Sequence, residues 1–443
     1  MLGGCRFEFA ADAGTLAPSI SEVRTLLEQD RVRQALTRAE LLQRQYSGPQ
    51  ADLVYGWALW RNGAVRSAET HFRRALEAGL VEGHVGVAVA RASAADWSTA
   101  VEMARAGLAA EEGAGVAHAV LASAAWVAGD AAAAGREMLA WGAAERGTSR
   151  GRAADAMGAA AARIEGPPQQ WTGGPEILPM HPLEGGGWAV EAVVSGSAAR
   201  LKLDLTFRQS LISEELVRAV GLPVDGAPGG GRAATSRWPS ILSSRQVAIP
   251  SVDFGDLSVR SVVVAVADAP PGVDGVIGAD LLVGARWTLL PLRAQLIIAP
   301  PPRAADVDSL SAPLTGSTLA WLRARVAREG VGTQVLLFPR VSDAVVAAGI
   351  DPGETSRLDS DSFEVLPGSN SAPANLMLGA WRSDVSWRPA SLAGWGVDGG
   401  VAPIAVLGSN ILESWALHWY PSSYQFRVDG PPSVPRDATA PLQ

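Results

Sequence analysis

The spacing of apolar residues divides the chain into a helical part and a strand-forming part. From about residue 18 to 163, apolar side chains recur at i, i+3, i+4 and i+7, which is the period of one helix face. After a Gly- and Pro-rich stretch that opens at Gly166, short apolar or alternating runs such as 188–194 and 262–266 are separated by turn residues. The pattern therefore predicts a multidomain chain in which an all-α part is followed by an all-β part.

Small residues repeat along the helical part 33, 32 and 34 positions apart by subtraction: Ala35, Ala68, Ala100 and Ala134. Residues able to pack follow each of them at +4 and +7, and a turn-type or small residue precedes each by five: Asp30, Gly63, Ala95 and Gly129. This period resembles the tetratricopeptide repeat (TPR), in which helical hairpins stack into a solenoid. The resemblance implies a concave groove for a peptide or protein partner, and an ordinary Ala-rich helical domain is the alternative.

The first half of the β part contains an ordered set of motifs. A small turn at Ser195-Gly196 precedes a run that reaches Asp204, and a hydroxyl-containing segment then leads into a helix-like stretch, 214–220, that closes on Gly221. This order resembles the retropepsin-like aspartic proteases, whose motif is Asp-Thr-Gly-Ala. Further on, 274–282 resembles the two-hydrophobics-then-Gly motif of that family.

A second copy of these motifs follows a proline-rich stretch. The segment 341–350 echoes 212–222, the turn at 378–381 echoes 254–257, and Val406-Leu407-Gly408 echoes Val276-Ile277-Gly278. The resemblance thus implies a two-lobed, pepsin-like all-β domain, with a helix in each lobe after the acid-bearing strand.

The domain boundaries that we predict follow these changes in pattern. They are an N-terminal segment, the helical repeats, a linker, a first protease-like lobe, a Pro-rich linker, a second lobe and a tail, at 1–17, 18–165, 166–178, 179–299, 300–316, 317–428 and 429–443.

The resemblance places Asp204 at the first catalytic position, but Leu205 and Thr206 replace the Thr and Gly of the motif. Counting nine positions back from Ser342, as from Ser213 to Asp204, gives Thr333 as the opposite position. An aspartic protease needs two facing carboxylates that share one proton. Because Thr333 is not acidic, we expect an inert domain with Asp204 as a vestigial residue.

Other acids near these motifs have structural interpretations. We expect Asp204 to be partly buried and bonded to turn amides, and Asp343 to cap a helix start. The family does not use the positions of Asp268, Asp274 and Asp280 in catalysis, and we expect such loop or turn acids to be solvated. Pairing of two Asp204 residues across a homodimer would conflict with the fused second lobe.

Composition narrows the classes of partner and cofactor. The net charge of -8 disfavours nucleic acid, because phosphate binding depends on Lys and Arg. The 5 histidines show no metal-ligand spacing, and no phosphate loop is present, so we predict no metal and no cofactor. No apolar run reaches the ~20 residues of a membrane span.

The single cysteine, Cys5, follows Leu2-Gly3-Gly4 and resembles a bacterial lipoprotein cleavage box. If the signal lies upstream of Met1, this resemblance implies a lipid anchor on Cys5 and a place in the bacterial cell envelope, on the periplasmic side. A chance cysteine in a cytoplasmic protein is the alternative. Mass spectrometry of a full-length precursor distinguishes these alternatives. Diacylglycerol on Cys5 would support the lipid anchor, and an unmodified thiol would exclude it.

Together, these features predict a non-catalytic scaffold that binds a peptide or protein through the helical repeats and a pseudo-aspartic-protease domain. The alternative is an active aspartic endopeptidase that uses Asp204, with the repeats recruiting its substrate.

Overall fold

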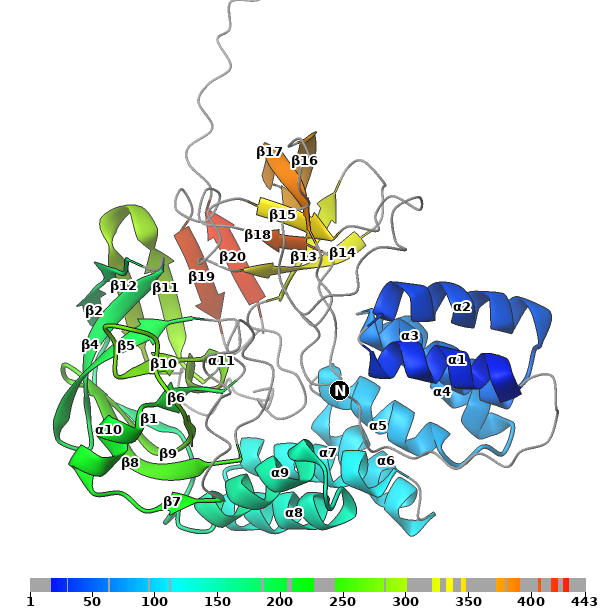
Figure 1. Ribbon diagram of the computed structural model, residues 1–443, viewed down its shortest axis with the longest axis horizontal. Coiled ribbons are helices and arrows are strands. Elements are labelled where there is room, and N and C mark those ends of the chain that lie inside the picture. The colour runs from blue at the N-terminus through cyan, green and yellow to red at the C-terminus, as the bar shows by residue number, and fades with distance from the viewer. Residues whose placement is uncertain are drawn as a thin grey trace, which may run out of the picture.

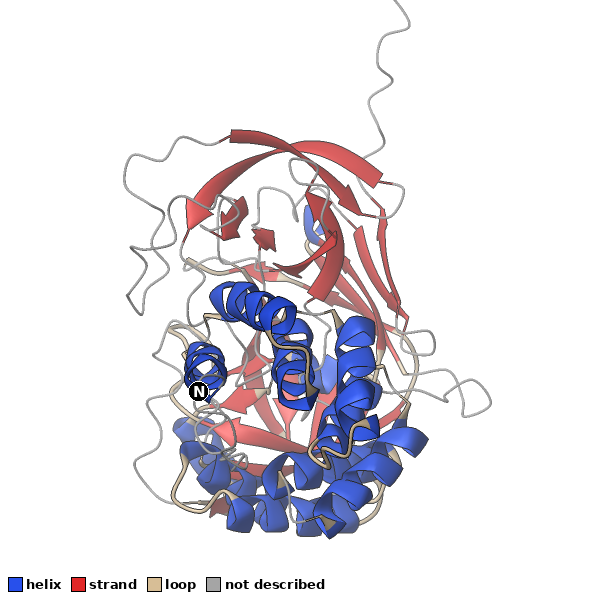
Figure 2. Ribbon diagram, turned by 90° about the vertical axis from the view of Figure 1, so that its right-hand side faces the viewer, coloured by secondary structure: helices blue, strands red, loops and turns tan. Residues whose placement is uncertain are grey.

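In the structure, a computed structural model, most of the helices lie together and apart from the strands (Figures 1 and 2). It describes residues 17–300, apart from 30, 63, 95, 111–112, 185–186, 205–208, 227–243 and 283, together with the backbone of further strands between 321 and 429. Cys5 and the rest of 1–16 lie outside the described residues, so the lipid anchor stays a prediction.

The helical part begins the described chain. Its helices are α1 (Ala17–Glu28), α2 (Val32–Gln45), α3 (Pro49–Arg61), α4 (Val65–Glu77), α5 (Gly83–Ser93), α6 (Trp97–Ala109), α7 (Ala114–Val127), α8 (Ala131–Ala144) and α9 (Ser149–Ala161). Consecutive helices pack against each other, and α1, α3, α5 and α7 also contact one another in turn. The helices therefore stack as successive pairs, and we call this part the helical array.

The repeated small residues lie on the second helix of each pair. Ala35, Ala68, Ala100 and Ala134 are all fully buried, as are the packing residues that follow them on α2, α4, α6 and α8. Gly129 has a φ of +81° in the turn before α8, as expected of a corner residue, while the other three predicted corners lie outside the described residues. The predicted packing face is confirmed, whereas the assignment to the TPR class stays a prediction.

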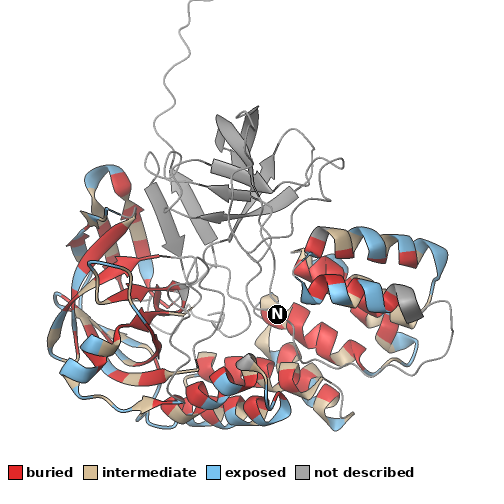
Figure 3. Cartoon of the chain, in the orientation of Figure 1, coloured by how far each residue is buried: buried red, intermediate tan, exposed pale blue. Residues whose placement is uncertain are grey.

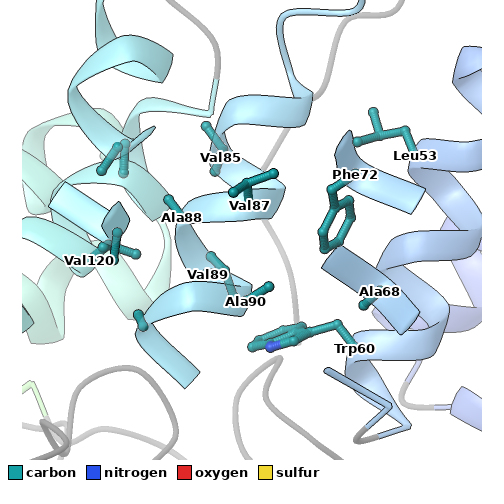
Figure 4. Close-up of a cluster of buried hydrophobic side chains, with 14 of the residues drawn as sticks. Leu53, Trp60, Ala68, Phe72, Val85, Val87, Ala88, Val89, Ala90 and Val120 are labelled. Carbon is teal, nitrogen blue, oxygen red and sulfur yellow. The ribbon is translucent and has the colours of Figure 1, made fainter. Parts of the chain in front are cut away.

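Phe72 shows how one pair is joined to the next. Its ring is fully buried between Gly56 on α3 and Gly86 on α5, beside Trp57 and close to Leu53 (Figure 4). A Cβ at Gly56 would lie 2.6 Å from the ring, and a Cβ at Gly86 would also overlap it. The two glycines therefore create the space that the aromatic ring fills.

The first lobe follows as a large sheet. Its strands are β1 (Gln170–Thr172), β3 (His181–Pro182), β4 (Trp188–Val194), β5 (Ser197–Leu203), β6 (Leu211–Ile212), β7 (Val224–Asp225), β8 (Gln246–Phe254), β9 (Leu257–Val266) and β10 (Gly275–Ile277), with α10 (Glu214–Val220) and α11 (Ala279–Leu282). The order is β1-β9-β6-β10-β5-β4-β8-β7, with β3 on β4 and an additional β8–β9 pairing.

Several local predictions for this lobe are confirmed. Strand β4 has the predicted bounds, and Ser195 and Gly196 make its turn to β5 with positive φ values of 47° and 89°. Helix α10 starts where the Ser213 hydroxyl accepts the Leu216 N–H at 3.1 Å, and it ends at Gly221, whose φ is +72°. A hydroxyl cap at the start and a left-handed glycine at the end are strong local signals.

Beyond residue 300, β13 (Trp321–Val326), β14 (Gly332–Leu337), β15 (Ala344–Ala347), β16 (Ala372–Leu378), β17 (Trp381–Ala390) and β18 (Ala405–Leu407) close into a barrel, the second lobe. Its pairings repeat those of the first lobe: β10 pairs parallel with β5 and antiparallel with β6, and β18 does the same with β14 and β15. The duplication that the sequence indicates is thus present in the strand pairing.

A third sheet joins the lobes. It contains β2 (Glu176–Pro179), β12 (Gln295–Ala299), β11 (Arg286–Leu290), β19 (Ala416–Tyr420) and β20 (Gln425–Asp429), in that order. A 3-10 turn (Pro291–Arg293) connects β11 to β12, and Trp287 of β11 pairs with Trp419 of β19. Backbone hydrogen bonds therefore connect the two halves of the β part.

One prediction for the second lobe is wrong. The segment that we expected to be a helix contains β15, in which Val345 pairs with Val406 and Ala344 with Trp387. Asp343, which lies outside the described residues, therefore precedes a strand and not a helix. A short apolar run such as 344–347 cannot be assigned to helix or strand by periodicity alone, and here the pairing with two neighbouring strands decides.

Candidate functional site

Asp204 directly follows β5, at the centre of the first lobe. Its N–H donates to the Ile277 carbonyl at 3.1 Å, which ties it to the end of β10. The residue is fully buried, with an exposed fraction of 0%. The structure therefore places Asp204 beside the Val276-Ile277-Gly278 motif, and the residue is wholly buried where we expected partial burial.

Lys202 lies beside the Asp204 carboxylate. Because side chains two residues apart on a strand point to the same side, Lys202 and Asp204 can meet. The Lys202 Nζ lies 3.4 Å from the Asp204 Oδ2. Both side chains are removed from solvent, at 4% and 0% exposed. The site thus holds a buried ion pair, which sequence reasoning missed although Lys202 stands between two leucines in the predicted strand.

Asp280 forms a second buried polar centre in the first lobe. Its Oδ1 accepts the Ser210 N–H at 2.8 Å, the Ser210 hydroxyl at 2.6 Å and the Leu281 N–H at 2.8 Å. The Ser210 Oγ in turn accepts the Gly278 N–H at 2.9 Å. Our expectation of a solvated Asp280 is wrong, because α11 turns its carboxylate inward toward a partner 70 residues earlier in the chain.

Burial raises the pKa of Asp280 from 3.8 to about 6, against the opposing effect of the hydrogen bonds from Ser210 and Leu281. Because the folded state holds this proton more tightly than the unfolded chain, the associated stability is full below pH 3.8 and is lost as the pH rises through about 6. We expect a decrease in the free energy of unfolding on the order of 3 kcal/mol across this window. Urea unfolding between these pH values measures it.

The matched control is Asp280→Asn, which keeps an oxygen for the Ser210 and Leu281 donors but cannot titrate. The difference in the free energy of unfolding between wild type and variant should change with pH in this window. An unchanged difference across the window would show that the Asp280 carboxyl does not titrate as described.

The other two acids near the motifs have different environments. Asp274 is half-buried, and its Oδ2 accepts the Arg200 N–H at 2.8 Å. Asp268 is exposed, as expected of a loop acid. Asp274 therefore braces the start of β10 against β5, and neither residue lies in the group formed by Lys202 and Asp204.

The strand register identifies the position in the second lobe that is equivalent to Asp204. Leu203 pairs with Ile277 and Leu337 pairs with Leu407, so the equivalent of Asp204 is the next residue, Phe338. The antiparallel neighbours agree: Leu211 lies opposite Val276 and Val345 opposite Val406, and each follows its equivalent position by 7 residues.

Thr333 lies within β14, opposite Ala324, and by this register it is not the equivalent of Asp204. The count back from Ser342 leads to Thr333 because it treats Ser342 as the equivalent of Ser213. It therefore treats the segment after Ser342 as a helix, although that segment contains β15. Phe338 itself, like 205–208, lies outside the described residues. Neither Thr333 nor Phe338 is acidic, so the corrected position also carries no second carboxylate in the sequence.

Two absences hold for the part of the chain that the structure describes. Among its residues, no three or more His, Cys, Asp or Glu side chains are grouped so that they could hold a metal ion. Within the same part of the chain, no helix combines the length and the apolar character needed to cross a membrane.

Comparisons with known proteins give one family match, and it lies within the β part. The model of the family described as aspartyl protease matches residues 190–281, which run from β4 into α11. No curated protein matches the chain. The family match lies within the first lobe, and it shows a likeness of this part of the chain to aspartyl proteases.

Two solved structures also align with the chain. A retropepsin-like aspartic protease from Rickettsia conorii is 14% identical over 29% of this chain and 93% of its own, with a TM-score of 0.22. An aspartic proteinase from Irpex lacteus is 11% identical over 58% of this chain and 97% of its own, with a TM-score of 0.34.

Proposed function

We propose that the chain is a non-catalytic, peptide- or protein-binding scaffold in which a TPR-like array is joined to a pseudo-aspartic-protease domain. The observation that carries the proposal is the buried ion pair between Lys202 and Asp204. In this proposal the acid of the first lobe stabilises the fold and does not activate water.

The chemistry of peptide hydrolysis supports this proposal. An aspartic protease needs one protonated and one ionised carboxyl group that share a proton and act on one water molecule. Beside Asp204 there is an ammonium group 3.4 Å away, and the equivalent position in the second lobe is Phe338 in the sequence. In this proposal the neighbour of the Asp204 carboxylate is a lysine ammonium and not a second carboxyl group. One acid alone cannot carry out the shared-proton mechanism.

The helical array supports the binding role. Its buried small residues recur with a spacing close to that of TPR proteins, which bind extended ligands on a stacked surface. Sheet-lined lobes suit an extended peptide as well. We further propose that the partner is a peptide or protein and that the scaffold acts at a bacterial cell envelope.

Incubation of the full chain with a mixed-peptide library from about pH 3 to about pH 7 tests the absence of activity. We expect no cleavage by the wild-type chain at any pH, because only one of the two required carboxyl groups is present. Mass spectrometry of the peptides measures cleavage. Uncleaved peptides that elute together with the folded chain in size-exclusion chromatography would identify ligands.

The matched variant is Asp204→Asn, which keeps the size of the side chain and removes its charge. Cleavage by the wild type that disappears in this variant would overturn the scaffold proposal and establish the alternative, an aspartic endopeptidase that uses Asp204. Circular dichroism of both proteins shows whether each sample is folded.

A further inference from the structure

Helix α9 is buried on two sides. One side packs on α8, and the other packs on β7, β8 and β9 of the first lobe (Figure 1). Its buried residues are mostly small: Ala153, Ala154, Ala156, Met157, Ala160 and Ala161. Val263 of β9 belongs to the same apolar cluster as Met157 and Trp126. The apolar cluster of the last helices thus extends to β9 of the first lobe, and Figure 3, in the orientation of Figure 1, shows buried positions along these helices.

The two ends of the array differ in a way that agrees with this packing. The exposed residues of α1 and α2 are mostly polar, with Leu41 as an exception, and include the ion pair of Arg38 with Glu22. A solenoid needs a polar face at each open end. At the other end α9 presents alanines, and the first lobe covers them, so this end is closed by the β part.

An ion pair connects the end of the helical array to the first lobe. Just after the helix, the Arg163 Nη2 donates to the Asp225 Oδ1 on β7 at 2.5 Å, and the Asp225 side chain is only 10% exposed. Next to it, Gly226 has a φ of +100°, and a Cβ there would lie 3.2 Å from the Ala156 Cβ. The helix thus holds the end of β7 by both charge and close packing.

A series of hydrogen-bonded residues connects Asp225 to Asp204. Asp225 pairs with Gln246 of β8, and the side-chain amides of Gln246 and Gln209 hydrogen bond reciprocally at 2.6 and 3.2 Å. The next residue after Gln209 is Ser210, whose hydroxyl accepts the N–H of Gly278. The neighbour of Gly278, Ile277, accepts the N–H of Asp204.

We propose that these contacts couple the helical array to the Asp204 site, so that a change at α9 alters the local stability of residues 209–213. The route runs through Arg163, Asp225, Gln246 and Gln209. A partner that strains or stiffens the array would act on residues 209–213 of the first lobe by this route. The coupling does not depend on whether the site cleaves peptides. A hydrogen-exchange experiment and the cleavage assay therefore test separate properties of the chain.

Hydrogen exchange of the intact chain, followed by mass spectrometry, tests the coupling. In Arg163→Ala we expect the amides of 209–213 and of 263–267 to exchange about fivefold faster or more. The matched control is Arg152→Ala, because Arg152 is exposed on α9 and its side chain donates to the nearby Gly147 carbonyl, away from the first lobe. The control should leave both segments at wild-type rates.

Coupling between two sites is reciprocal, so a second variant tests the same route from the other end. Gln209→Ala should speed exchange at the end of α9, in 160–164, because it removes the paired amides that lead from Gln246 to Gln209. Unchanged exchange at 209–213 in Arg163→Ala, or an equal increase in Arg152→Ala, would overturn the proposal. Unchanged exchange at 160–164 in Gln209→Ala would overturn it as well.

Discussion

Replacement of Lys202 with methionine should lower the free energy of unfolding by about 3 to 5 kcal/mol, because it leaves the buried Asp204 carboxylate without its ion-pair partner. The length of the side chain is nearly unchanged, so the loss is electrostatic and not a packing defect. Urea unfolding followed by tryptophan fluorescence at neutral pH measures the change.

Two variants control this result. Arg200→Met, on the same strand, removes a side chain that is 37% exposed and whose guanidinium lies 3.8 Å from Glu191, so it should cost less than about 1 kcal/mol. The double variant Lys202→Met with Asp204→Leu replaces the whole pair by apolar groups and should recover most of the loss. If Lys202→Met costs no more than Arg200→Met, Lys202 does not neutralise a buried acid.

Phe72→Ala should lower the free energy of unfolding of the helical array by about 3 to 5 kcal/mol, because the ring is fully buried where two helix pairs meet. Its loss leaves a cavity between Gly56 and Gly86 that the helices can close only in part. Thermal unfolding followed by circular dichroism at the helical band measures the loss.

The two glycines supply the control. Gly86→Ala alone should cost about 1 to 3 kcal/mol, since its new Cβ overlaps the Phe72 ring. In the Phe72→Ala background the same change should be nearly neutral, because the space is then free. Strictly additive losses would show that Phe72 does not occupy the space beside Gly86.

Much of the local structure could be predicted from the sequence, because short-range signals determine it. The recurring small residues on the second helices, the cap and closing glycine of α10, and the turn after β4 all depend on neighbours within a few residues. Periodicity and capping act within one element, so one sequence suffices to recognise them.

What the sequence did not reveal depends on contacts between distant elements. Ser210 and Asp280 are 70 residues apart, and only the fold brings the hydroxyl to the carboxylate. The shift from Thr333 to Phe338 needed the pairing of β18 with both β14 and β15. Lys202 was visible in the predicted strand, but only its burial against Asp204 shows that it has a structural role.

A crystal structure of the full chain that defines the side chains around Asp204 tests the central claim most directly. We predict the Lys202 Nζ close to the Asp204 Oδ2, near the 3.4 Å separation found here, with no acidic side chain from the second lobe opposite it. A second carboxyl group within hydrogen-bonding reach of Asp204, directly or through one water molecule, would contradict the scaffold proposal and favour a working protease.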